Sequence, residues 1–395
     1  MHNLTQEGDA RGSKGDTTLA CQRAARIVGA SRGDPLTRHL FNAIDRRYGM
    51  VGRIDTELRP WQRYLAALAT FRLSRARWGE RYWKSLLSFR MRSRNSRARL
   101  AHIRQPYDAV LQVHALFQTR GAPYILYVDN THQQSVLGWP IWNPLHGRDL
   151  ERWYARERAT YEGALHIFTM GEPPVTSLVE FYGIPRERVS NVGGGANFET
   201  LPALSDSIRQ PVILFVGHDF ARKGGDQLLA AFRRVRAQMP EARLQIVGTS
   251  AVPAEPGIEV LGRIDDRRRV ADLYARASIF CLPSYFEPYA LVLMEAMAHG
   301  LPCVSTGVCG IPEIVVDGET GLLVPPGDSA ALAAALLRLL GDPAQAARLG
   351  AAGRRRVEQH LNWDRVVDRM SPVLDRLDGG TRVAQPCRSP VVAGA

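Results

Sequence analysis

The fold of this chain is decided by residues 282–328, which read LPSYFEPYALVLMEAMAHGLPCVSTGVCGIPEIVVDGETGLLVPPGD. Two carboxylates, Glu287 and Glu295, stand eight positions apart in this stretch. They flank the run YALVLM, which contains neither glycine nor charge and follows Pro288. Because proline suits the first turn of a helix, we predict a helix that opens at Pro288.

The two carboxylates of this predicted helix could bind the two ends of a long ligand. At ~100° per residue they differ by ~80° in azimuth and ~12 Å in height, which is too far apart for an acid/base pair acting on one bond. The free N–H groups of Tyr289, Ala290 and Leu291 lie between them, and helix N-termini attract phosphate. A nucleotide-diphosphate sugar has hydroxyls at both ends and an anionic middle, so it fits this arrangement.

The motifs SYFEPYALVLMEAMAHGLPCV and GIPEIVVDGETGLLVPPGD resemble the donor-site signature of glycosyltransferase family 4, within glycosyl transferases group 1. The resemblance covers residues 160–377 well and the first 160 residues loosely. It implies a retaining enzyme of the α/β GT-B fold, with two Rossmann-like domains facing a cleft and a C-terminal crossover helix. It also implies that Glu287 faces the transferred sugar and Glu295 the ribose hydroxyls. Ala290 and Cys309 depart from the family, which usually has glycine at both positions.

A polar loop after the apolar run VILFV carries the predicted phosphate site. The resemblance implies that an arginine after Gly217 and a lysine five positions further on contact the donor diphosphate. Lys223 matches that lysine, His218 stands at the arginine position, and Arg222 could supply the missing cation. Because negative charge develops on the departing phosphate, these side chains would stabilise it without a metal.

The resemblance assigns further positions outside this loop. The backbone at Arg263 and Ile264 is expected to border the nucleobase. A short strand candidate near the N-terminus turns at Arg32 and Gly33, where the family often has glycines near the acceptor. A buried strand candidate further along ends at His132, and ligands of such sheets bind at the carboxyl ends of strands. The family carries a histidine there, near the transferred sugar and the acceptor.

The length of 395 residues is enough for two domains of ordinary size. No run of ~18 apolar residues occurs, so we predict no membrane-spanning segment. The predicted divisions are a disordered tail (1–22), an acceptor domain (23–203), a nucleotide-sugar domain (204–362), a crossover helix (363–378) and a second tail (379–395).

The five cysteines show neither CxxC nor Cys/His ligand spacing, so the sequence predicts no metal site. No cofactor is expected beyond the nucleotide sugar as co-substrate. The N-terminal residues lack the apolar stretch of a secretory signal. We therefore expect a reducing, cytoplasmic location.

The net charge of +12 is concentrated in one segment, Arg59–Arg104, which holds thirteen basic residues and one acid, Glu80. Apolar residues at helical spacing alternate with these charges, so the segment is predicted to be helical and amphipathic. Three interpretations stay open. The segment could be a helix pair packed on the core, a surface that docks on anionic lipid at the inner face of the membrane or holds an anionic acceptor, or a nucleic-acid site. No nucleic acid is expected, because no recognition motif accompanies the charge.

These features predict metal-independent, retaining hexosyl transfer from a UDP- or GDP-sugar to a glycan, lipid-linked or small-molecule acceptor. One alternative is a catalytically inactive GT-B protein that binds a nucleotide sugar or glycan. A second is a basic protein that docks on membrane or nucleic acid, with the fold as a platform. A sugar-nucleotide epimerase on the same fold is a third.

Overall fold

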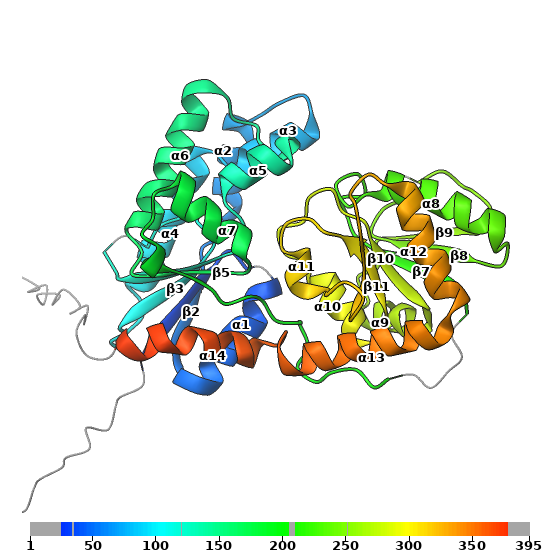
Figure 1. Ribbon diagram of the computed structural model, residues 1–395. Helices are drawn as coiled ribbons and strands as arrows, with labels where there is room; N and C mark the ends of the chain where they lie inside the picture. The colour runs from blue at the N-terminus through cyan, green and yellow to red at the C-terminus, as the bar shows by residue number, and fades with distance from the viewer. Residues whose placement is uncertain (1–24, 34, 120, 205–209, 251, 378–395) are drawn as a thin grey trace, which may run out of the picture.

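The computed structural model describes residues 25–33, 35–119, 121–204, 210–250 and 252–377. They form two α/β domains that lie side by side (Figure 1). The predicted terminal tails, 1–22 and 379–395, lie outside the described residues.

The N-terminal domain is built on a six-stranded sheet in which all pairings are parallel. In order across the sheet, the strands are β2 (Met50–Asp55), β1 (Ile27–Ser31), β3 (Ala109–Val113), β4 (Tyr124–Val128), β5 (Ile167–Thr169) and β6 (Val189–Asn191). Every residue of β1, β3 and β4 is buried, as expected for parallel strands covered on both faces. The sequence did not reveal β2, because this half-exposed edge strand, MVGRID, contains a glycine and two charges.

The helices of this domain are α1 (Pro35–Tyr48), α2 (Pro60–Ala69), α3 (Arg75–Trp83), α4 (Leu86–Leu100), α5 (His132–Gly138), α6 (Gly147–Glu162) and α7 (Glu172–Thr176). Shorter turns are η1 (Pro140–Trp142), η2 (Ser177–Phe181) and η3 (Arg186–Arg188). The basic segment forms three helices, α2 to α4, so the expected helix pair is wrong. A break around Ser74 and the Ser85 N-cap of α4 divide it.

The C-terminal domain repeats the design with a second parallel sheet. Its strands, in order, are β12 (Gly321–Val324), β11 (Cys303–Thr306), β10 (Ile279–Leu282), β7 (Val212–Val216), β8 (Arg243–Val247) and β9 (Ile258–Gly262). Its helices are α8 (Gly225–Gln238), α9 (Arg267–Arg276), α10 (Leu291–Ala298), α11 (Ile311–Ile314), α12 (Ser329–Gly341) and α13 (Pro343–Gln359). Counted from β7, the order is that of a Rossmann sheet.

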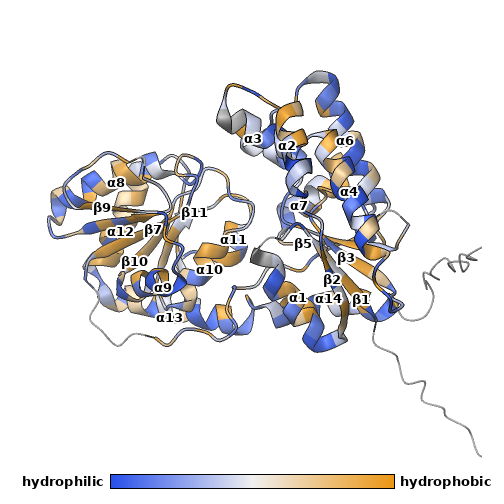
Figure 2. Cartoon of the chain, turned by 180° about the vertical axis from the view of Figure 1, so that it is seen from behind, coloured by the Kyte–Doolittle hydropathy of each residue, from blue (hydrophilic) through white to orange (hydrophobic). Residues whose placement is uncertain are grey.

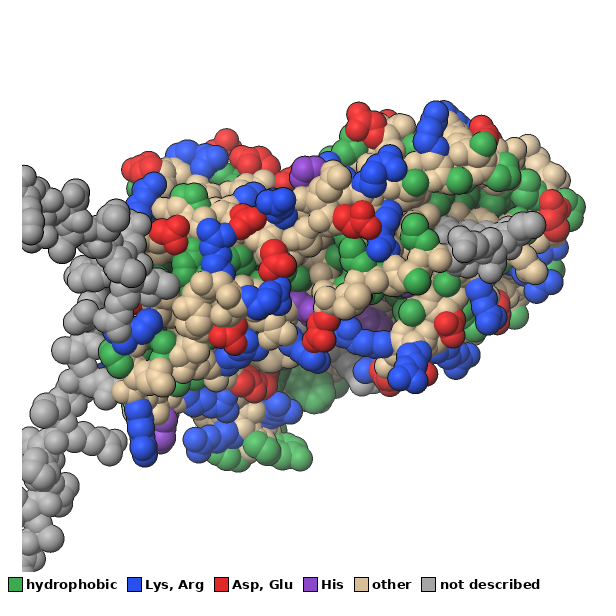
Figure 3. All heavy atoms as spheres, turned by 90° about the horizontal axis from the view of Figure 1, so that it is seen from below, with side chains coloured by type: hydrophobic (Ala, Val, Ile, Leu, Met, Phe, Trp, Pro, Cys, Tyr) green, Lys and Arg blue, Asp and Glu red, His purple; other side chains and the backbone are tan. Residues whose placement is uncertain are grey.

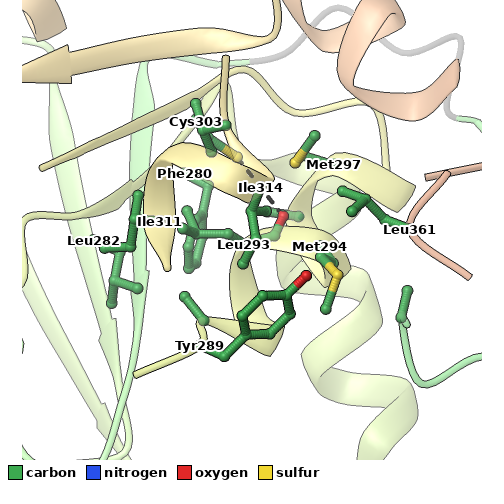
Figure 4. Packing of buried hydrophobic residues seen from close by; sticks show 14 of the residues in the cluster. Phe280, Leu282, Tyr289, Leu293, Met294, Met297, Cys303, Ile311, Ile314 and Leu361 are labelled. Atoms are coloured by element: carbon green, nitrogen blue, oxygen red, sulfur yellow. Dashed lines mark hydrogen bonds between the residues drawn. The ribbon is translucent and has the colours of Figure 1, made fainter. Parts of the chain in front are cut away.

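Helix α10 lies in the core of this domain, where Leu293, Met294 and Met297 pack among strand residues such as Phe280 (Figure 4). It begins at Leu291, so the prediction that it opens at Pro288 is wrong. Ala290 is the N-cap, with a non-helical ψ of 82°. Glu287 therefore lies outside the helix, and the spacing derived for two carboxylates on one helix does not apply.

The last helix, α14 (Trp363–Leu374), is followed by the turn η4 (Asp375–Leu377) and packs beside α1 of the N-terminal domain (Figure 1). The Trp363 indole is buried, and its Nε1 donates to Asn197 Oδ1 at 3.1 Å. The hydroxyl of Tyr48 donates to Asp375 at 2.7 Å. The chain thus returns to its first domain. The face of the molecule seen from below carries both acidic and basic side chains (Figure 3). None of the described helices is both long and apolar enough to cross a bilayer.

Candidate active site

A cavity of about 370 Å³ opens between the two domains. Its walls combine charged groups with aromatic rings. The lining residues from the first domain include Arg32, Glu80, Trp83, Lys84, His114, Asp129, Asn130, His132, Trp142, Trp153 and Glu157. Glu287 and Tyr289 line the cavity from the second domain.

The sheet topology explains why these residues meet. Parallel sheets bind ligands outside the carboxyl ends of strands, at the point where the strand order reverses. In the first sheet that point lies between β1 and β3, which are followed by Arg32 and His114. In the second it lies between β7 and β10, which are followed by the loop with Lys223 and by Glu287. Both reversal points contribute to the site.

Glu287, Lys223 and Arg222 form one buried cluster, as expected for residues predicted to share a site. Lys223 Nζ lies 2.7 Å and Arg222 Nη1 3.1 Å from the same Oε2 of Glu287. The Glu287 side chain is only 8% exposed. Two cations therefore offset the burial of this carboxylate.

Arg222 connects the loop to both domains. Its Nη1 also donates to the Phe286 carbonyl at 2.6 Å, and its Nε donates to Asp219 Oδ2 at 3.2 Å. Across the domain boundary, its guanidinium lies over the Trp142 ring, 4.6 Å from the centroid. These contacts hold Arg222 in a fixed position.

Glycine at position 217 leaves room for Lys223. A Cβ at Gly217 would lie 2.3 Å from Lys223 Cδ, so any larger residue would displace the lysine. The neighbouring His218 is exposed, and its Nδ1 lies 3.3 Å from the Gly248 carbonyl oxygen. His218 therefore reaches the ends of β7 and β8, outside the ion-pair cluster.

The predicted nucleotide residues lie in the same domain. Glu295 accepts a long hydrogen bond of 3.4 Å from the Tyr274 hydroxyl. Burial raises the Glu295 pKa, while Arg267, Tyr274 and Lys223 oppose the shift. The exposed Arg263 follows β9 and donates to Asp265 at 2.8 Å, and the half-buried Ile264 packs on the core. Like Lys223, Arg222 and His218, the three predicted nucleotide residues are not among the cavity-lining residues.

The segment before α10 does not form the first helical turn that the sequence predicted. The Tyr289 hydroxyl accepts a hydrogen bond of 3.1 Å from the N–H of Gly194, which lies in the linker that follows β6. This bond draws the segment before α10 toward the linker. Burial raises the Tyr289 pKa to about 12. Ala290 is buried, and Leu291 is the first residue of the helix. Cys309, where the family usually has glycine, adopts a left-handed φ of 49°.

His132 lines the cavity, but its predicted place at a strand end is wrong. β4 ends at Val128, and His132 is the first residue of α5, whose N-cap is Thr131. Its Nε2 lies 3.1 Å from Asn143 Oδ1. Burial, together with the nearby charge of Lys84, lowers its pKa to about 3, so the imidazole is neutral.

The sequence interpretation missed the pair that does occupy the strand ends. His114 Nδ1 lies 3.2 Å from Asp129 Oδ1, directly after β3 and β4. Burial opposes ionisation of Asp129, but His114, a backbone hydrogen bond and Arg32 outweigh it and lower the pKa. His114 also has a left-handed φ of 64°, a strained conformation that often marks functional sites. Their positions directly after the runs AVLQV and YILYV were the available signal.

A second missed group comes from α3, the adjoining loop and α6. Lys84 Nζ lies 3.3 Å from Glu80 Oε2, and burial lowers the lysine pKa. Glu157 is buried behind them and accepts hydrogen bonds from Tyr182 and from the His132 N–H. Burial raises the Glu157 pKa to about 7. Glu80 and Lys84 are four positions apart and pair locally, whereas Glu157 joins them only through packing, which no motif marks.

The two residues of the predicted acceptor-side turn, Arg32 and Gly33, differ in where they lie. Arg32 lines the cavity, and its guanidinium lies 4.8 Å from the centroid of the Trp83 ring. Gly33 is exposed, with a left-handed φ of 81° that allows the turn. Within the described residues, no group of three or more His, Cys, Asp or Glu side chains could hold a metal ion.

Two Rossmann-like domains, a shared cavity and a returning C-terminal helix define a GT-B protein, so the predicted fold class is confirmed. Residues 210–342 match the family Glycosyl transferases group 1. Glycogen synthase of Mycobacterium tuberculosis is 28% identical over 297 residues, which are 71% of this chain and 69% of that protein. The MMP alpha-(1->4)-mannosyltransferase of Mycolicibacterium hassiacum is 29% identical over 58% of each chain.

The fold agrees with a solved structure of sucrose-phosphate synthase from Thermosynechococcus elongatus, with a TM-score of 0.67. The identity is 22%, over 89% of this chain and 99% of that one. Over residues 210–342 the chain is therefore similar to the group 1 glycosyl transferases, which confirms the resemblance at that level. Membership of family 4 in particular stays a prediction.

Proposed function

We propose that this protein transfers a hexose from a nucleotide-diphosphate sugar to a carbohydrate acceptor, with retention and without a metal. The observation that carries the proposal is the buried contact of Lys223 with Glu287 at the strand-order reversal of the C-terminal sheet. A cation there can stabilise the charge that develops on a departing phosphate. The related enzymes support sugar transfer, and the resemblance supports retention. Metal independence follows from the lack of ligand spacing in the sequence, and a cytoplasmic location from its cysteines and N-terminal residues.

In this proposal, Lys223 contacts the donor phosphate and Glu287 faces the transferred sugar. Glu295 would accept hydrogen bonds from the ribose hydroxyls, as the single carboxylate on α10. Arg222 already donates to three acceptors, so we assign it a positioning role for Glu287 alongside its charge. His218, Arg263 and Ile264 would border the nucleotide at the ends of β7 and β9, and the backbone of Tyr289, Ala290 and Leu291 would approach the phosphates.

The first-domain wall of the cavity supports a sugar as acceptor. Trp83, Trp142 and Trp153 provide aromatic surface beside polar groups. Trp153 Nε1, His132 Nδ1 and Asn130 Oδ1 are buried and have no hydrogen-bond partner among the residues that the structure describes. One donor and two potential acceptors are thus available to hydroxyls, which can both donate and accept. We propose that this wall, with Arg32 at its edge, binds a sugar ring of a free or lipid-linked glycan.

A thermal-shift panel of UDP- and GDP-sugars, followed by transfer assays, tests the donor. A true donor stabilises the folded state by about 2.7 kcal/mol at a concentration one hundred times its Kd. Stabilisation without turnover on any sugar acceptor would favour the inactive binding protein. If neither UDP- nor GDP-sugars shift the melting temperature, the donor proposal is wrong.

A further inference from the structure

Helix α2 buries polar and small side chains, the reverse of an ordinary surface helix. Its buried residues are Gln62 and Ala66, and the buried Thr70 follows at the next turn. Gln62 is held by reciprocal amide hydrogen bonds with Asn95 of α4, at 3.1 and 2.8 Å. Polar and small side chains therefore attach α2 to the domain, whereas helices normally bury their large apolar residues.

The outward face of α2 and the turn after it carry the large apolar side chains. Their exposed fractions are Trp61 56%, Tyr64 78%, Leu65 48%, Leu68 77%, Phe71 54% and Leu73 97%. Six of the eleven large exposed apolar residues in the described chain thus lie within thirteen positions. Apolar side chains scattered singly need no explanation, but a contiguous group marks an interaction surface.

The charge of this segment indicates the partner. Arg59, Arg63 and Arg72 are exposed among the apolar side chains. No acidic residue occurs between Arg59 and Gly79. Leucine with tryptophan and tyrosine, flanked by arginine, is typical of helices that lie in the interface of an anionic membrane. Two copies joined through this face would bring their arginines together, so charge disfavours self-association.

The position of α2 relates the surface to the cavity. α2 and α3 lie together at the end of the N-terminal domain farthest from α14 (Figures 1 and 2). The end of α3 and the residue after it supply Trp83 and Lys84 to the cavity. η1, which packs against α3, carries the exposed Ile141. A bilayer that contacts α2 would therefore lie near the cavity's first-domain wall.

We propose that the face formed by Trp61, Tyr64, Leu65, Leu68, Phe71 and Leu73 docks on an anionic lipid bilayer, with Arg59, Arg63 and Arg72 contacting lipid head groups. The surface lies on α2 rather than on α4, because Arg90, Arg94 and Arg97 of α4 are exposed but no large apolar side chain of that helix is. Arg92 of α4 is fully buried, with its guanidinium 4.7 Å from the Trp83 ring centroid. The docking does not depend on the donor chemistry proposed above, but it would favour acceptors held at a membrane.

Sedimentation of the full chain with vesicles tests the proposal, without any sugar nucleotide present. Vesicles of phosphatidylcholine and phosphatidylglycerol should bind the protein, and vesicles of phosphatidylcholine alone should bind it much less. The L68S/L73S variant should lose about tenfold or more of its affinity, because apolar burial contributes to interfacial binding. R59Q/R72Q should lose affinity and salt dependence together.

The matched control, L165S/L204S, removes two exposed leucines elsewhere and should bind as the unchanged protein does. Each variant is accepted only if its melting temperature matches that of the unchanged chain. Equal binding by L68S/L73S, or equal loss in the control, would overturn the proposal. So would a dimer of the unchanged chain in sedimentation equilibrium that L68S/L73S abolishes, since a second copy would then cover this face. Transfer assays on a water-soluble acceptor keep this outcome separate from the proposed activity.

Discussion

The Glu287 carboxylate is almost fully buried and accepts hydrogen bonds from two cations, Arg222 and Lys223. The two cations differ in how firmly their other contacts hold them. Lys223 is attached through a single contact to Glu287 Oε2, and its remaining protons can reach a ligand. Arg222 is attached through three acceptors and a ring. The same pair of charges thus combines one adaptable group with one rigid group.

Lys223→Met should separate catalysis from stability. Removing the charge that faces the departing phosphate should lower kcat by about 10²–10³-fold. The fold should suffer less, since Arg222 still pairs with Glu287. Arg222→Met is the comparison, and it should lower the free energy of unfolding by about 3 kcal/mol, because it also removes the bonds to Asp219 and the Phe286 carbonyl. Near-normal turnover of Lys223→Met would remove this lysine from the proposed mechanism.

Glu157 predicts a pH dependence of stability. Its pKa is about 7 in the folded chain, against an ordinary value of 4.5, so the folded state holds a proton that the unfolded state has lost between these values. Stability attributable to this residue must therefore fall as pH rises from 4.5 to 7. Glu157→Gln retains an acceptor oxygen and should remove the fall.

The difference in unfolding free energy between Glu157→Gln and the unchanged chain should grow to at most about 3 kcal/mol in favour of the variant above pH ~7. Urea denaturation at a series of pH values measures it. Glu162→Gln, on the same helix, is a control that should show no such trend. A difference that is constant with pH would contradict the burial argument.

At the scale of elements, strand ends and the loops after them determine the site. Gly217 follows β7 at the position where Lys223 must pass, and Glu287 follows β10 before α10 begins. The three residues between Glu287 and α10 remain non-helical because Tyr289 is bonded to Gly194 of the linker. The length of this segment, rather than a helix dipole alone, sets where the carboxylate lies.

Gly217→Ala should therefore reproduce much of the loss caused by removing Lys223. The added methyl group would lie 2.3 Å from Lys223 Cδ and displace the side chain. Donor affinity should fall by about tenfold, or ~1.4 kcal/mol, in a calorimetric titration. Gly307→Ala, where no atom lies within 4 Å of the added Cβ, is the matched control in the same domain. If the two variants bind the donor equally, the packing of Gly217 against Lys223 does not matter for binding.

At the scale of the whole molecule, several contacts join the domains around the cavity. Glu313 of the second domain accepts from Asn191 at 2.8 Å and from the Glu172 N–H at 2.7 Å. Trp363 of α14 packs edge-on against Tyr127, with ring centroids 6.3 Å apart. These contacts couple the two domains.

Trp363→Ala should test this coupling. Loss of the buried indole should lower the free energy of unfolding by about 3–5 kcal/mol and let the first domain unfold at lower urea than the second. Circular dichroism and fluorescence unfolding curves would then cease to coincide. Trp363→Phe keeps most of the packing and should lose only about 1 kcal/mol with the hydrogen bond to Asn197. A single, unshifted transition for Trp363→Ala would show that α14 does not couple the domains.

The sequence by itself determined the fold class and drew attention to Lys223 and Glu287, which the structure brings into contact. Lys223 follows an apolar strand and a glycine, and Glu287 stands just before an apolar helix-forming run, so local patterns made both residues candidates. Such patterns are readable because they lie within one strand, loop or helix. The exact start of α10 was not readable, because a hydrogen bond from the distant Gly194 decides it.

Only the tertiary structure decided the acceptor side. His114 meets Asp129, and Glu157 joins the local pair of Glu80 and Lys84, because packing brings separate elements to one cavity. The direction of α2 was also hidden, since its alternation of apolar and basic residues fits either face. Its amide contact with Asn95 turns the apolar side outward. Periodicity shows that a helix has two faces, and only its packing partners determine which face is buried.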